Sequence, residues 1–77
     1  MFAINSQIVI FITRNGSTTS KEKVFVEGTF DACDETFVII SDQFGSVIEV
    51  KEKDLVTAMK NKQKALYIPE ASGLWEY

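Results

Sequence analysis

Stretches rich in β-branched and aromatic residues alternate with short polar segments along the chain, which predicts a series of β-strands. The first stretch, Gln7–Thr13, is apolar on both faces, and its length and β-branching favour a strand over a buried helix. Asn15-Gly16 follows it and is typical of a hairpin turn. The polar segment 17–23 has no apolar residue, which indicates a solvated hairpin tip or two strand ends that project beyond the body.

The second predicted strand runs from Val24 to about Cys33 and has a glycine in its middle. A period of two places a small and largely apolar set of residues on one face: Val24, Val26, Gly28, Phe30 and Ala32. A glycine inside a strand usually marks a bend, a bulge or a close backbone approach. We therefore expect the strand to bend at Gly28, so that it serves both sheets of a small barrel.

Two further strands are predicted over residues 36–41 and 46–51. Asp34-Glu35 supplies the turn before the first of them, and the segment 42–45, which ends in a glycine, supplies the turn between them. Apolar and charged residues alternate in the second of these strands, which is typical of a half-buried strand.

The segment 54–59 fits either a helix or a strand. Asp54 is a suitable N-cap, and the alanine, methionine and lysine that end the segment favour a helix. In contrast, Leu55-Val56-Thr57 is consistent with a short fifth strand.

The remainder of the chain contains a basic run, a second candidate for the last strand, and an aromatic tail. The basic run covers residues 60–64, and the second candidate strand covers residues 65–68, where Pro69 stops it. The tail, residues 70–77, carries large apolar side chains that are costly to expose. We expect these side chains to dock on the protein's own barrel or on a neighbouring subunit.

These elements predict an all-β fold, a small and strongly bent antiparallel barrel of about five strands, with a short helix or tail at its C-terminal end. The 77 residues make one domain. A chain of this length buries only about 60–65% of its unfolded surface, so its core is marginal alone.

The composition argues against catalysis. The chain has no His and a single cysteine, Cys33, which excludes the usual zinc ligand sets and the nucleophilic triads. The net charge of −3 gives no overall positive field to attract nucleic acid. We therefore expect no catalytic residues, no metal and no cofactor, and binding or structural functions remain open.

Neither targeting nor membrane insertion is indicated by the sequence. The first seven residues lack the basic region and the cleavage site of a secretory signal. The apolar run 8–12 is far shorter than the roughly 20 residues of a membrane span. Because a free thiol fits a reducing compartment, we expect a cytoplasmic protein that does not bind membranes.

One turn gathers carboxylates next to the cysteine. Asp31, Asp34 and Glu35 fit a structural turn, with a Mg²⁺ or Ca²⁺ site as the alternative. Negative neighbours raise the pKa of a thiol, so Cys33 is expected to be a packed core or interface cysteine and not a nucleophile.

The stretch 26–43 resembles the first motif of the Sm and Sm-like protein family (LSm and Hfq-type proteins). That motif reads apolar-x-Gly-x-large apolar-x-x-apolar-Asp, followed by a short turn and an apolar strand that ends near an acidic residue. The matching residues, in order, are Gly28, Phe30, Cys33, Asp34, Val38-Ile39-Ile40 and Asp42. Segments 8–16 and 45–59 resemble the family's first strand and second motif, so the resemblance covers residues 7–59.

Positions of the family's RNA pocket differ in this chain. Where the family usually carries an Asn that binds a base edge, Phe37 or Val38 stands, and neither forms such a hydrogen bond. Lys51 and Glu52 replace the family's Arg-Gly pair, and a lysine lacks the planar bidentate fork of an arginine. Phe37 can stack on a base or belong to the core of its strand.

The resemblance implies a non-catalytic ring of identical subunits, a hexamer or heptamer, in which the fourth strand of one subunit pairs with the fifth of the next. It favours residues 55–57 as the fifth strand and limits the barrel to residues 7–59, with the basic segment and tail in 60–77. Under the RNA-binding hypothesis, the residues expected to bind RNA are Thr36, Phe37, Lys51 and Lys53. The two lysines are expected to alternate onto one strand face. The alternative is a structural or protein-interaction module that keeps the ring, no longer binds RNA and engages other proteins through the tail.

Overall fold

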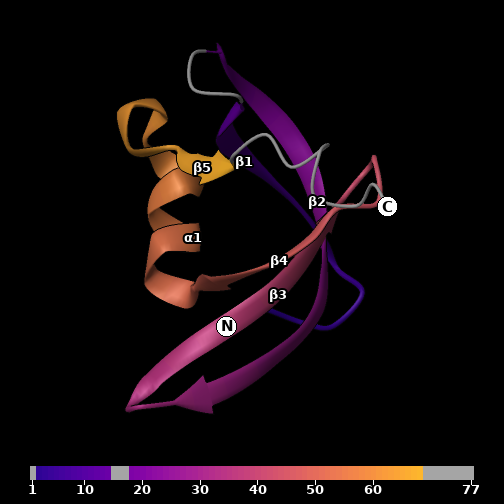
Figure 1. Ribbon diagram of the computed structural model, residues 1–77, viewed down its shortest axis with the longest axis vertical. Coiled ribbons are helices and arrows are strands. Elements are labelled where there is room, and N and C mark those ends of the chain that lie inside the picture. The colour runs from indigo at the N-terminus through magenta and orange to yellow at the C-terminus, as the bar shows by residue number, and fades with distance from the viewer. Residues whose placement is uncertain (1, 15–17, 69–77) are drawn as a thin grey trace, which may run out of the picture.

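In the computed structural model, which describes residues 2–14 and 18–68, five strands form one strongly curled sheet around a short helix (Figure 1). The strands are β1 (Gln7–Arg14), β2 (Thr18–Ala32), β3 (Glu35–Asp42), β4 (Val47–Lys51) and β5 (Leu66–Ile68). The helix α1 (Glu52–Lys60) and the 3₁₀ turn η1 (Lys62–Lys64) lie between the last two strands. The sheet order is β4-β3-β2-β1-β5, antiparallel throughout except for the parallel pair of β1 and β5. The expected small, strongly bent β fold is confirmed.

The turn predicted at Asn15-Gly16 lies outside the described residues, as does Ser17. Residues 18–23 are part of β2, so of the two alternatives the strand end is correct and the solvated tip is wrong. Residues 18–25 pair with β1 along its whole length, so β2 begins six residues before the predicted strand. The polar residues of this half are accommodated because their outward side chains reach solvent. The inward Glu22 meets an ionic partner, Arg14 of β1.

The bend expected at Gly28 is confirmed as a β-bulge. Val26 pairs with Ile40 but Gly28 pairs with Ile39, so Glu27 is an extra residue on β2. An extra residue reverses the side-chain alternation beyond it. Gly28, Phe30 and Ala32 therefore leave the face of Val24 and Val26, and the prediction that these five residues share one face is wrong beyond the bulge.

The turn between β2 and β3 is formed by Cys33-Asp34, not by Asp34-Glu35. Cys33 (φ 50°) and Asp34 (φ 63°) both adopt the left-handed conformation that a two-residue hairpin turn requires. As a consequence, Cys33 is exposed at the tip of the hairpin and is not packed in the core of the protomer.

Residues 55–57 lie in α1, so the fifth strand predicted there is wrong and the helical alternative is correct. Leu55 and Ala58, one helical turn apart, are fully buried against the sheet. The helix crosses the concave side of the sheet from β4 to the opposite edge, where β5 runs parallel to β1. The sheet therefore takes its last strand from 66–68, beyond the expected end of the barrel at residue 59.

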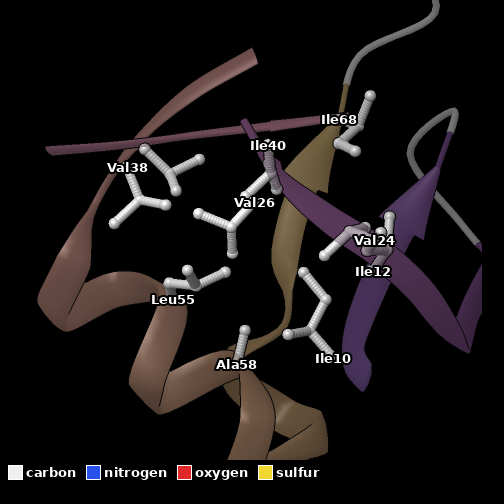
Figure 2. Close-up of a cluster of buried hydrophobic side chains, with 10 residues drawn as sticks. Ile10, Ile12, Val24, Val26, Val38, Ile40, Leu55, Ala58 and Ile68 are labelled. Atoms are coloured by element: carbon white, nitrogen blue, oxygen red, sulfur yellow. The ribbon is translucent and has the colours of Figure 1, made fainter. Parts of the chain in front are cut away.

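The core lies between the concave face of the sheet and α1 (Figure 2). Its buried side chains are Ile10, Ile12, Val24, Val26, Val38, Ile40, Val50, Leu55, Ala58 and Ile68. They come from every strand and from the helix, so the concave side of the sheet is filled by the chain itself.

Candidate functional site

Three of the four residues predicted to bind RNA lie together at one end of the sheet. Phe37 on β3 is the cross-strand partner of Lys51 on β4, and Thr36 precedes Phe37. Lys53 is exposed in the first turn of α1. The expectation that Lys51 and Lys53 alternate on one strand face is therefore wrong, because the strand ends at Lys51.

Phe37 is a surface residue of the sheet and is stacked on another aromatic ring. Its cross-strand partner on β2 is Phe30, and the two ring centroids are 5.3 Å apart with an interplanar angle of 12°. Both rings lie on the convex side of the sheet, since the neighbouring Val38 points into the core. The bulge brings them together, because without Glu27 as an extra residue Phe30 would face inward.

The polar groups of this cluster are engaged by carboxylates. The Thr36 hydroxyl donates a hydrogen bond to Oδ1 of Asp31 (2.8 Å), and the Lys51 Nζ is 3.6 Å from Oε1 of Glu35. Asp34 lies in the adjoining turn. A phosphate near Lys51 would have to compete with Glu35 and approach three carboxylates, which is unfavourable.

Further apolar residues lie on the same convex side of the sheet, and we call the set of them the outer face. It consists of Val9 and Phe11 on β1, Phe25 and Phe30 on β2, Phe37 and Ile39 on β3, and Val47 on β4. Four of the seven are more than a third exposed: Val9 (41%), Phe25 (38%), Phe30 (37%) and Val47 (60%). Six of these residues stand at odd-numbered positions of the predicted strands, so the sequence already indicated that they share a face. Phe30 stands at an even-numbered position and joins them only because the bulge shifts the register.

An ionic network lies at the edge of the core, on the inner side of the sheet. The sequence pattern did not predict it. Arg14 on β1 donates to both carboxylate oxygens of Glu22 (2.9 and 2.7 Å) and to Oδ2 of Asp42 (2.7 Å). Asp42 also accepts hydrogen bonds from the backbone N–H groups of Phe44 and Ser46, both at 2.9 Å. The network ties β1, β2 and β3 to the turn before β4.

This network lowers the pKa of both carboxyl groups. For Glu22 the main cause is the hydrogen bond from Arg14, which outweighs burial. For Asp42 burial favours the neutral form. The hydrogen bonds from Arg14, Ser46 and Phe44 outweigh it, so the pKa still lies below its usual value of 3.8. The two carboxylates raise the pKa of Arg14.

We expect acid to destabilise the fold through these two groups. A carboxyl group with a lowered pKa in the folded state contributes stability above its unfolded pKa and loses it as the pH falls through the folded pKa. Thermal unfolding measured from pH 6 to pH 2 should show this loss below about pH 4, close to the ordinary pKa values of these carboxyl groups. A wild-type profile for Asp42→Asn would contradict the assignment.

Comparisons with protein-family models, with curated proteins and with solved structures find no match to this chain. Residues 2–14 and 18–68 contain no cluster of three or more acidic, Cys or His side chains able to hold a metal ion. No helix in the same ranges is long and apolar enough to cross a membrane. The tail, with Leu74, Trp75 and Tyr77, lies outside the described residues.

Proposed function

We propose that this chain is a non-catalytic assembly subunit that associates with further copies of itself. The observation that carries the proposal is the outer face, where seven apolar side chains point away from the core, with charged side chains between them, and four of the seven are more than a third exposed. Soluble monomers rarely leave large contiguous apolar patches in water, and such patches usually mark interaction sites. The marginal core expected for 77 residues makes association a further source of stability.

The Sm-like resemblance adds a ring of six or seven subunits to this proposal. Among residues 2–14 and 18–68, β4 pairs with β3 and β5 pairs with β1, and neither has a second strand neighbour. Each therefore has one edge without a strand partner among these residues. The resemblance put the fifth strand at residues 55–57, which are helical, so the strand that would pair with β4 of another copy is β5, residues 66–68.

A second candidate function is binding of single-stranded RNA at the convex side of the sheet. It is favoured by the stacked Phe30–Phe37 pair beside Lys51, since exposed aromatic rings on a sheet can stack on unpaired bases. The contact between Lys51 and Glu35 and the nearby Asp31 argue against it, so we place it second.

Native mass spectrometry of the full chain, with and without a short U-rich RNA, tests both functions. Masses that are multiples of the 8.7 kDa chain at about 10–50 µM, a range in which weak interfaces still associate, support the assembly function, and a strict monomer contradicts it. Retention of RNA at near-physiological salt that Phe37→Ala abolishes would support RNA binding. No RNA retained by the wild-type chain would eliminate that candidate.

A further inference from the structure

The charges of the outer face are separated along β2. Lys21 and Lys23 point outward on one side of Phe25, where they pair across the strands with Phe11 and Val9. Glu27, the bulged residue, lies on the other side of Phe25. The outer row of β2 therefore reads positive, positive, aromatic, negative.

Contacts within the chain hold two of these charged groups at the surface. The Ser41 hydroxyl on β3 donates a 2.6 Å hydrogen bond to Glu27, and Ser41 is the cross-strand partner of Phe25. The Lys21 ammonium is 5.3 Å from the centre of the Phe11 ring. These contacts reduce the side-chain freedom that would be lost when a partner binds.

We propose that the outer face packs against the same face of a second copy, with the two β2 strands antiparallel about a two-fold axis at Phe25. The inference rests on the proposed self-assembly and names its surface. In this arrangement Lys23 faces Glu27 of the partner subunit, and the two-fold axis repeats that pair. A parallel arrangement would place like charges opposite each other, so the charge order selects the antiparallel one.

A second copy fits this face better than a strongly acidic or a strongly basic partner. Such a partner would match one end of the β2 row and be repelled at the other, whereas a copy supplies both signs. The apolar side chains around Phe25, among them Val9, Ile39 and Val47, would be buried between two sheets about 10 Å apart, the usual face-to-face distance. Because the sheet is curled, contact centres on Phe25, and we expect a dissociation constant in the micromolar range, on the order of 1–100 µM.

Charge reversal and its rescue test this arrangement. Sedimentation velocity of the full chain at low salt should show a dimer, or an even number of subunits where edge pairing also occurs. Lys23→Glu and Glu27→Lys should each raise the dissociation constant about tenfold, because each turns two attractive pairs into repulsive ones. The double variant restores opposite charges at both pairs and should restore association. Lys62→Glu, an equal charge change on exposed η1, should have no effect.

A second variant keeps the test independent of charge. Phe25→Thr retains a strand-forming residue and should abolish pairing while the thermal midpoint of the dilute monomer changes little. If all of these variants associate as strongly as the wild-type chain, the face pairing is overturned and self-assembly stands. A wild-type chain that stays monomeric would overturn both, so the two failures are distinguishable.

Discussion

Replacing Arg14 with methionine is expected to lower the free energy of unfolding by about 2–4 kcal/mol, because it leaves two inward-facing carboxylates without their cation. The Asp42 side chain is only 2% exposed and that of Glu22 only 10%. A chain of 77 residues has a total stability of roughly 4–12 kcal/mol, so the loss should be visible as a large shift in the urea midpoint at pH 7.

The mechanism makes this loss dependent on pH and on the partner residues. Without Arg14, burial favours the neutral forms of Glu22 and Asp42, so protonation should begin to relieve the penalty above their ordinary pKa values. The difference from wild type should therefore narrow steadily as the pH falls from 7 toward 4 and below. Adding Glu22→Gln and Asp42→Asn to Arg14→Met should recover part of the stability at pH 7. Lys62→Met, which removes an exposed lysine, should change stability by less than about 0.5 kcal/mol. If Arg14→Met lost no more than this control, the ionic network would have no stabilising role.

The same network explains why the sequence pattern did not predict the first half of β2 as a strand. The segment 17–23 is polar throughout, and a strand is recognised by its apolar inward positions. At Glu22 the inward position is occupied by a carboxylate whose partner, Arg14, lies 8 residues before it in the sequence. Arg14 in turn binds Asp42, which lies 20 residues after Glu22. Local patterning carries no information about such long-range pairs, whereas the strands with apolar inward residues, β1, β3 and β4, were predicted to within about a residue or two.

The candidate site was predictable only as far as the alternation within single strands shows it. The alternation in β3 and β4 brought Phe37 and Lys51 to one end of the sheet, as expected. The bulge at Gly28 was also predicted, but not which residue is extra, and this decides the face on which Phe30 lies. The exposed apolar outer face depends on that register and could not be read from any one strand.

The segment 54–59 shows how tertiary packing decides between two local structures. Val56 and Thr57 favour a strand, and their neighbours Ala58 and Met59 favour a helix. The curled sheet leaves a concave side that one strand would not fill. A helix presents Leu55 and Ala58 to it together (Figure 2). The choice is therefore made by the core and not by propensity.

Replacing Leu55 with alanine is expected to cost about 2–5 kcal/mol, because it removes a fully buried side chain where α1 meets Val26 and Val38. Alanine is a better helix former than leucine, so a loss of stability would report lost packing and not a weaker helix. The urea midpoint should fall while the slope of the transition stays unchanged.

Met59→Ala is the matched control, because Met59 lies in the same helix, has a side chain of similar size and is 36% exposed. It should cost under about 1 kcal/mol, since most of the transfer and cavity cost arises at fully buried positions. Equal losses for the two variants would mean that α1 is not seated on the concave face. A large loss for Leu55→Ala alone would show that Leu55 is part of the core, as its position in α1 requires.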